Sequence, residues 1–196
     1  MDVQLRNAKG ETEEEFLKNY NPNRYPCPAV TVDIIVFQKQ DNHLKVLLVK
    51  RKNHPYIGKW AFPGGFLNID ENIKDAAYRE LKEETSVEAH QVELHQLHTY
   101  GSVHRDPRMR VISIAYIAVV HQDISVKAMD DAEDAAWFDI TMTQQQLSLK
   151  HDDMNLSFIK TEDGYQKLSD SLSLAFDHLN ILSDALQYLK DNKLIE

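Results

Sequence analysis

The segment from residue 73 to residue 85, IKDAAYRELKEET, predicts a helix whose acidic side chains face the interior of the fold. On a helical projection at about 100° per residue, with Ile73 taken as zero, Ala77 falls at about 40°. Glu84 lies at about 20° and Glu80 at about 340°, so both carboxylates lie within the apolar stripe. A chain that buries this stripe must place two carboxylates inside its fold and supply a partner for them.

Three explanations compete for the cluster of Glu80, Glu83 and Glu84. A solvated acidic face is the ordinary one, but it does not suit side chains within an apolar stripe. An ion pair with Arg79 could neutralise one or two carboxylates, but hardly three. Two carboxylates about 5–6 Å apart repel by about 3 kcal/mol at an effective dielectric of roughly 20. A divalent cation turns this repulsion into attraction, and hard oxygen ligands suit Mg²⁺ or Mn²⁺, so we favour metal binding.

The composition of the chain limits its class. Its 196 residues, 42% of them hydrophobic, suffice for one substantial core. No run of eighteen apolar residues occurs and the N-terminus is polar and acidic, so neither a membrane span nor a signal peptide is expected. The single cysteine, Cys27, suits a reducing cytoplasm, and the net charge of −9 argues against nonspecific nucleic-acid binding.

Apolar patterning predicts more strands than helices. The clearest strand is the β-branched run AVTVDIIVF, and segment 44–52 is its hairpin partner. Further strands are expected at 60–62, 91–100, 110–120 and 135–140, with a hairpin that joins 156–160 to 165–169. Helices are expected at 11–20, 73–85 and 176–192, capped by Thr12, Asn72 and Asp177, with Asp75 completing an approximate capping box after Asn72. This order of elements predicts an α/β sandwich with a mixed sheet and a C-terminal helix.

The segment that begins at Gly65, GFLNIDENIKDAAYRELKEETSV, resembles the Nudix box, whose pattern is G-x5-E-x7-R-E-U-x-E-E-x-G-U with U aliphatic. Eight of the nine fixed positions match over twenty-three residues: Gly65, Glu71, Arg79, Glu80, Leu81, Glu83, Glu84 and Val87. The departure is Ser86, where the family has a glycine that ends the helix in a left-handed conformation. A serine there should cost about 1 kcal/mol or less, and it leaves the acids intact.

The resemblance implies an α/β/α sandwich that uses a divalent metal, Mg²⁺ with Mn²⁺ as the alternative, to hydrolyse a nucleoside diphosphate linked to another group. Glu80 and Glu84 match the main metal ligands of the family, and a backbone carbonyl at Gly64 or Gly65 often joins them. Glu83 matches a third ligand or the base that activates water.

Arg79 matches the residue that orients the cluster, with Glu71 as its expected partner. Catalytic roles are therefore expected for Glu83, Arg79 and Glu71. The water-activating base stays open between Glu83 and an acid in the loop before AEDAAWF, Asp130 or Asp131, where many Nudix enzymes place an additional acid. These two aspartates fit a solvated acidic loop equally well.

The sequences that flank the box narrow the resemblance. The segments YPCPAVTVDIIVF, GKWAFPGGFL, YGSVHRDPRMRVISIAY, DDAEDAAWF and LAFDHLNIL together resemble a branch of Nudix proteins that handle ADP-ribose. The branch includes repressors of NAD-metabolism genes, which carry a winged helix after the segment that matches LAFDH. An intact box favours the enzyme, as does a chain that stops at Glu196, where a winged helix would begin.

The stretch HRDPRMR predicts a cationic loop between two strands. Arg105, Arg108 and Arg110 present guanidinium groups that suit phosphate or carboxylate, and Arg51 at the end of the second strand is a further candidate. We expect Arg51, Arg105 and Arg108 to bind substrate. A solvated basic turn that balances an acidic protein is the alternative.

We therefore expect a pyrophosphatase that converts ADP-ribose into AMP and ribose 5-phosphate. The alternatives are an ADP-ribose-sensing regulator, or a fragment of one without its winged helix, and a Nudix hydrolase for another dinucleotide or sugar nucleotide. The expected partners are a small nucleoside diphosphate substrate and a second copy of the chain, with neither membrane nor nucleic acid. We expect an N-terminal helix and lead-in over 1–29, a catalytic domain over 30–145, and a hairpin with a helical extension over 146–196.

Overall fold

The computed structural model describes residues 5–41, 43–129, 132–162, 164–168 and 173–195. Within this part of the chain ten strands form one mixed sheet in the order β10-β9-β8-β7-β2-β1-β6-β5, while β3 pairs with β2 and β4 with β1. The strands are β1 Ala29–Gln40, β2 His43–Arg51, β3 Trp60–Ala61, β4 Gly64–Phe66, β5 His95–Tyr100, β6 Val111–Val120, β7 Ala132–Met142, β8 Gln146–His151, β9 Met154–Thr161 and β10 Gly164–Lys167. The helices are α1 Glu13–Asn19, α2 Ile73–Thr85 and α3 His178–Asp191. No helix among these residues is long and apolar enough to cross a membrane.

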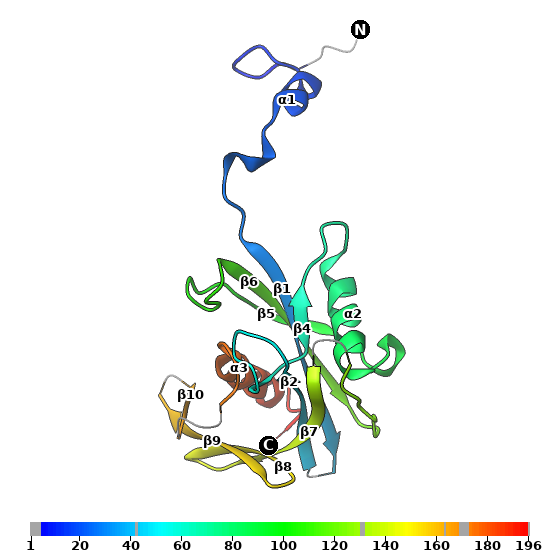
Figure 1. The fold of residues 1–196 in the computed structure, drawn as a ribbon, viewed down its shortest axis with the longest axis vertical. Coiled ribbons are helices and arrows are strands. Elements are labelled where there is room, and N and C mark those ends of the chain that lie inside the picture. Colours follow the sequence, from blue (N-terminus) through cyan, green and yellow to red (C-terminus); the bar gives the residue numbers. More distant parts are fainter. Residues whose placement is uncertain (1–4, 42, 130–131, 163, 169–172, 196) are drawn as a thin grey trace.

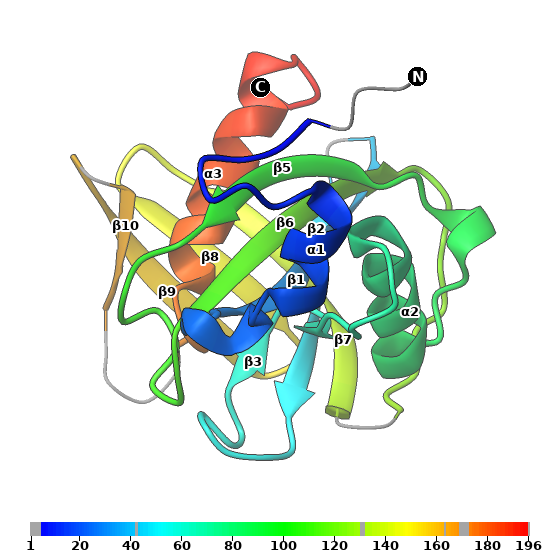
Figure 2. The ribbon, with the colours of Figure 1, turned by 90° about the horizontal axis from the view of Figure 1, so that it is seen from above.

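Strand β1 lies in the middle of the sheet because both of its faces are apolar. It pairs in parallel with β6 and antiparallel with β2. Successive side chains of a strand point to opposite faces. Ile34 accordingly packs in one core with Leu81 of α2, and the next residue, Ile35, packs in the other core with Leu182 of α3. The two helices cover opposite faces of the sheet (Figure 1, Figure 2), which confirms the α/β/α sandwich with a mixed sheet and a C-terminal helix.

Most predicted elements are present, and α2 spans the predicted residues 73–85. The prediction omits β8, a short strand that continues the sheet from β7, and β7 itself extends beyond both ends of the predicted segment 135–140. Strands β8, β9 and β10 belong to the same sheet as the strands before residue 145. The division of the chain after residues 29 and 145 stays a prediction.

The first two of the three predicted helix caps, Thr12 and Asn72, have different outcomes. Thr12 begins α1 with a capping box, in which its hydroxyl accepts the Glu15 N–H and the Glu15 carboxylate accepts the Thr12 N–H. Asn72 begins α2, but its side chain accepts no backbone N–H. Its Nδ2 instead donates to Asp75 Oδ2 at 2.9 Å. The predicted capping box of α2 is therefore wrong, because the two side chains bond to each other.

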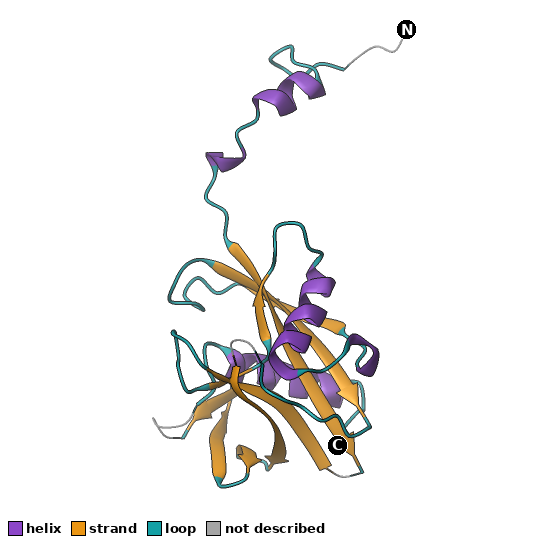
Figure 3. Cartoon of the chain, turned by 45° about the vertical axis from the view of Figure 1, so that its right-hand side comes forward, coloured by secondary structure: helices purple, strands orange, loops and turns teal. Residues whose placement is uncertain are grey.

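Residues 5–28 form an arm that extends away from the sandwich (Figure 1, Figure 3). No residue of α1, the helix within this arm, is buried. Phe16 and Tyr20 contact each other with their ring centroids 5.6 Å apart, and both remain more than 40% exposed. The arm therefore adds nothing to the core of the sandwich.

Ser86 ends α2 in the left-handed conformation that the glycine of the Nudix box predicts, with φ 64° and ψ 10°. Its hydroxyl donates to Lys127 O at 3.2 Å and lies 3.0 Å from Met129 Sδ. We expect Ser86→Gly to raise the free energy of unfolding by about 0.5–1 kcal/mol, because glycine adopts this backbone conformation without strain. Urea unfolding of the two proteins checks this; a loss of stability would show that the hydroxyl contacts outweigh the strain.

Candidate active site

Arg79 lies at the centre of the acidic cluster on α2. Its Nε and Nη2 donate to the Glu71 carboxylate at 2.7 and 2.8 Å, and these bonds lower the pKa of Glu71 to about 2. Its Nη1 donates to Glu80 Oε1 at 2.7 Å and to Glu83 Oε2 at 2.9 Å. One guanidinium thus contacts two carboxylates of the cluster of Glu80, Glu83 and Glu84, as expected for a single arginine, and it also binds Glu71, its expected partner. A single positive charge does not balance three negative charges, so the cluster still favours a cation.

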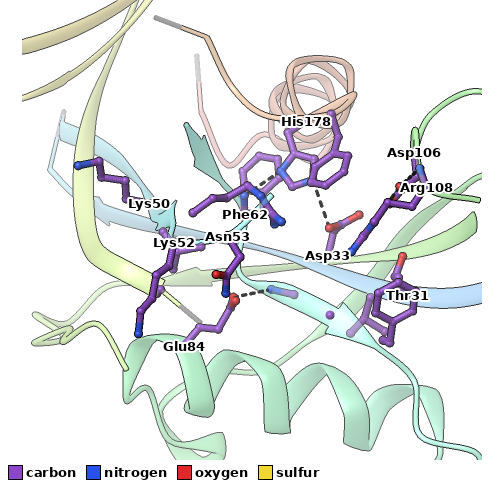
Figure 4. Close-up of a pocket in the computed structure, with 18 of the residues that line it drawn as sticks. Thr31, Asp33, Lys50, Lys52, Asn53, Phe62, Glu84, Asp106, Arg108 and His178 are labelled. Carbon is purple, nitrogen blue, oxygen red and sulfur yellow. Dashed lines mark hydrogen bonds and ion pairs between the residues drawn. The ribbon is translucent and has the colours of Figure 1, made fainter. Parts of the chain in front are cut away.

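Two consecutive glycines bring the backbone of β4 against the carboxylates of Glu80 and Glu84. The Gly64 N–H donates to Glu84 Oε2 at 2.9 Å (Figure 4). A Cβ at Gly65 would lie 2.4 Å from Glu80 Oε1, and a Cβ at Gly64 would lie 2.1 Å from Val32 O. Neither position has room for a side chain. The carboxylates of Glu80 and Glu84 therefore approach neighbouring residues of β4.

These oxygens are the ligands that a hard divalent cation prefers. Burial raises the pKa of the Glu80 carboxyl although Arg79 opposes the shift, so its negative charge is poorly solvated. Among the described residues no three Asp, Glu, His or Cys side chains already surround a common point; Glu80 and Glu83 face Arg79, and Glu84 faces the Gly64 N–H. The carboxylates of Glu80 and Glu84, which lie against the adjacent glycines of β4, nonetheless fit a divalent ion. The metal roles of these residues stay predictions.

Charged side chains from separate segments form a second cluster, which the sequence does not predict as a unit, and three of them, Asp33, Arg105 and His178, line one pocket together with Glu84. Asp33 of β1 accepts a hydrogen bond from Arg105 Nη2 at 3.2 Å and another from the Ser113 hydroxyl, and its Oδ1 lies 3.3 Å from His178 Nε2. Arg105 also donates to Asp177 from Nε and Nη2, at 2.9 and 2.8 Å. We call Asp33, Arg105, Asp177 and His178 the buried charge cluster.

His178, the first residue of α3, joins this cluster to the loop before β4. Its Nδ1 accepts the Phe62 N–H at 2.8 Å, so its other nitrogen, Nε2, carries the proton that faces Asp33 (Figure 4). Asp177 begins α3 as predicted, but its side chain makes no cap hydrogen bond because both oxygens bind Arg105. Asp177, the predicted cap of α3, therefore pairs with Arg105 instead of the helix backbone.

The network around Asp33 predicts a loss of stability in acid. Burial alone would raise the pKa of the Asp33 carboxyl, but His178, Arg105 and Ser113 outweigh it and lower the pKa from 3.8 to about 2. A lowered pKa stabilises the fold above the unfolded value, and this contribution, about 2 kcal/mol, disappears as the pH falls from about 4 to about 2. Urea unfolding of the wild type and of Asp33→Asn should therefore differ less at pH 2.5 than at pH 5. A constant difference would contradict the assignment.

The arginines of the HRDPRMR loop lie in different surroundings. The Arg105 side chain is only 4% exposed, inside the buried charge cluster. Arg108 is partly exposed at the mouth of the pocket and donates from Nε and Nη2 to buried Asp106, at 3.0 and 2.7 Å. Arg110 donates to Gly101 O and Ser102 O and so ties the ends of its own loop together.

The pocket joins Glu84 of α2 to Arg105 and Arg108 of this loop (Figure 4). It is lined by β1, the β2–β3 loop, β4, α2, the β5–β6 loop and the start of α3, and Arg51, Arg105 and Arg108 all border it. The lining residues that the sequence predictions miss include Thr31, Asp33, Asp106, Phe176 and His178. Two of these residues, Phe176 and His178, lie in the segment LAFDH, whose resemblance to the ADP-ribose branch was the signal that could have found them. Asp130 and Asp131 lie outside the described residues.

Comparisons with known proteins agree with this geometry. The model of the NUDIX domain matches residues 28–157. The chain is 38% identical to the ADP-ribose pyrophosphatase of Methanocaldococcus jannaschii over 81% of its own length and 88% of that protein. It resembles the structure of the NUDIX domain of Shewanella oneidensis NrtR complexed with ADP ribose, with a TM-score of 0.68 and 30% identity, covering 91% of this chain and 99% of the other.

A second relative belongs to the class of repressors. The chain is 30% identical to the ADPR responsive transcriptional repressor NtrR of Acinetobacter baylyi over 92% of its own length, and it spans 62% of the length of that protein. The box segment that carries the acidic cluster lies wholly within residues 28–157, which the NUDIX model matches. The match to the NUDIX model and the similarity to these relatives agree with the carboxylates held against the two glycines and with the sandwich around them. The chain therefore belongs to the Nudix family.

Proposed function

We propose that this protein hydrolyses ADP-ribose to AMP and ribose 5-phosphate with the help of Mg²⁺, or of Mn²⁺. The observation that carries the proposal is the set of carboxylates held against Gly64 and Gly65, with Glu84 bonded to the Gly64 N–H and Glu80 packed on Gly65. The similarity to an ADP-ribose pyrophosphatase and to a NUDIX domain complexed with ADP ribose supports this substrate.

The reaction adds water across the diphosphate. Water attacks one phosphorus, the bond from that phosphorus to the bridging oxygen breaks, and the two phosphomonoesters leave. Glu80, Glu84 and a backbone oxygen at Gly64 would hold the divalent ion, which polarises the phosphoryl oxygens and lowers the pKa of the attacking water. Glu83 is the residue that we propose as the proton acceptor, because its side chain is 42% exposed and only one of its oxygens bonds to Arg79. Asp130 and Asp131 are the alternatives.

Arg79 and Glu71 position this cluster. The bidentate pair between them fixes the guanidinium, which also donates from Nη2 to Phe66 O at 3.1 Å. Arg79 thereby ties α2 to β4, the strand that carries both glycines. Arg51 and Arg108 also border the pocket, and we propose that they contact the substrate.

A substrate panel tests the proposal. ADP-ribose, NADH, sugar nucleotides and dinucleotides are incubated with the protein and Mg²⁺ or Mn²⁺, and the phosphomonoester products are measured as phosphate after a coupled phosphatase. We expect the highest kcat/KM for ADP-ribose and no activity with EDTA. Faster hydrolysis of another diphosphate would replace the substrate but keep the reaction, whereas no hydrolysis of any diphosphate would contradict the reaction itself.

An ADP-ribose-sensing regulator is the second candidate, and the similarity to the Acinetobacter baylyi repressor favours it. With a net charge of −9 we expect this 196-residue chain to show no specific DNA binding at physiological salt. A gel-shift titration with operator fragments, with and without ADP-ribose, measures this. Nanomolar binding that ADP-ribose abolishes would favour the regulator.

We also propose a homodimer, because the exposed aromatic residues of the arm have no partner on the rest of the described chain. Phe16 and Tyr20 contact each other, and α1 buries none of its residues. Sedimentation equilibrium of the full chain, compared with Phe16→Ser, measures the assembly. A monomer for the wild type would contradict the proposal.

A further inference from the structure

Four side chains form a ladder across the mouth of the pocket, in which aromatic rings and guanidinium groups alternate. The Arg108 Cζ lies 5.0 Å from the centroid of the Phe66 ring and 5.9 Å from that of Phe176. The Arg51 Cζ lies 4.9 Å from the centroid of the same Phe176 ring. The ladder therefore runs Phe66, Arg108, Phe176, Arg51, and its longest spacing is between Arg108 and Phe176.

The guanidinium of Arg108 presents a flat face rather than a charged fork. Two of its nitrogens, Nε and Nη2, already bind the two oxygens of Asp106, whose side chain is only 3% exposed. This pair cancels the charge of Arg108 and uses the edge that would grip a phosphate bidentately. The remaining surface suits stacking on a planar group. A phosphate clamp, the role expected for Arg108 from the sequence, is therefore the weaker match to these contacts.

A hydrogen-bonding group beside the ladder has no partner. Thr31 Oγ1 is fully buried and is the buried side-chain oxygen or nitrogen without a hydrogen bond among the described residues. Thr31 pairs with Phe66 across β1 and β4, so both side chains point to the same face of the sheet, and both line the pocket (Figure 4). Buried polar groups nearly always have partners, so an orphan in a pocket indicates a ligand atom or water.

Phe176 is held in an unusual backbone conformation. Its φ is 50°, in the region that bulky residues rarely occupy. Its ring contacts that of Tyr56 in a T-shaped arrangement at a centroid distance of 4.8 Å, and the ring of His178 in the buried charge cluster lies 5.6 Å away. Residues in such conformations gather at ligand clamps, where the surrounding structure fixes them. The ring of Phe176 is thus positioned in advance.

We propose that this ladder is the nucleobase subsite of the enzyme, and that the base stacks between Phe176 and the guanidinium of Arg108. The proposal rests on the proposed function, because it assigns one part of that substrate. An inserted ring needs about 7–8 Å between its two neighbours, so Arg108, which is 41% exposed, moves outward by about 1–2 Å. The Thr31 hydroxyl then bonds to a nitrogen or amino group at the edge of the base. The diphosphate extends from there toward the carboxylates of α2.

The test compares ADP-ribose with the diphosphate of two ribose 5-phosphates, which keeps both sugars and the diphosphate and lacks the base. Phe176→Leu should raise KM for ADP-ribose about tenfold with little change in kcat, since base stacking on an aromatic ring is lost. Thr31→Val, which is isosteric, should raise it about threefold. Neither variant should change KM for the compound without a base. Ile159→Ala on β9 is the control, because Ile159 is 43% exposed and lies outside the pocket.

Binding measurements separate this proposal from the proposed function. Titration calorimetry of ADP-ribose without divalent ions needs no hydrolysis, and thermal melting confirms that each variant is folded. If the wild type binds ADP-ribose and Phe176→Leu weakens only that binding, the nucleobase subsite stands even where hydrolysis is absent. Equal weakening of both compounds, no weakening, or a wild type that binds the two compounds equally well would overturn it.

Discussion

Glu84→Gln should lower the turnover of ADP-ribose by about a hundredfold or more while the fold stays intact. Loss of one charged ligand in a water-poor site removes roughly 3–4 kcal/mol of transition-state stabilisation. The glutamine keeps an oxygen that can accept the Gly64 N–H, the bond that Glu84 Oε2 makes at 2.9 Å, so the backbone of β4 should not move. Initial rates over a range of Mg²⁺ concentrations give both kcat and the apparent affinity for the ion.

The control for this variant is Glu93→Gln, which removes the same charge from a side chain that is 83% exposed. Its turnover should stay within about twofold of the wild type. Thermal melting without metal adds a second readout, since Glu84→Gln removes a like charge from the cluster and should not lower the melting temperature. Near wild-type turnover of Glu84→Gln would remove this residue from the metal site.

Arg105→Ala should destabilise the fold by about 3–5 kcal/mol, because it leaves buried Asp33 and half-buried Asp177 without their cation. Arg105 is 4% exposed, and its contacts with Asp33 and Asp177 lie at 3.2 and 2.8 Å. For a chain of this length such a loss lowers the melting temperature by roughly 10 °C. Urea unfolding measures the free energy, and circular dichroism of the native state shows whether the variant folds at all.

Arg108→Ala provides the comparison within the same loop. Its own side chain is 41% exposed, but it pairs with one buried carboxylate, Asp106, which keeps the backbone N–H of residue 108 as a donor, so we expect a smaller loss of about 1–3 kcal/mol. The two variants thus separate a positioning residue from one that contacts the ligand. If Arg105→Ala melted within about 2 °C of the wild type and raised KM, the substrate role expected from the sequence would be restored.

The sequence was most informative where one local pattern determined the structure. The helix of residues 73–85 follows from its apolar periodicity, and the left-handed conformation of Ser86 follows from its position in the box. The pair between Arg79 and Glu71 has no such periodicity, because Glu71 lies outside α2, and only the resemblance to the Nudix box predicted it.

The buried charge cluster shows why the rest of the site was missed. In the sequence Asp33 is one polar residue within a β-branched strand, and its partners Arg105 and His178 lie far along the chain. No periodicity links such residues, since the sheet and α3 bring them together only in three dimensions. Asp177 illustrates the same limit, because its position before a helix predicts a cap while its neighbour in space is Arg105.

The contact between His178 and the Phe62 N–H has a consequence for the order of assembly. Helix α3 completes a pocket whose glutamate, Glu84, and glycines come from the first half of the chain, so the binding site is finished only when α3 docks. Ligand affinity and the local stability of α3 are then linked equilibria: whatever binds in the pocket also holds the C-terminal helix against the sheet. Hydrogen exchange of the α3 amides would consequently report on occupancy of a site formed largely by other parts of the chain.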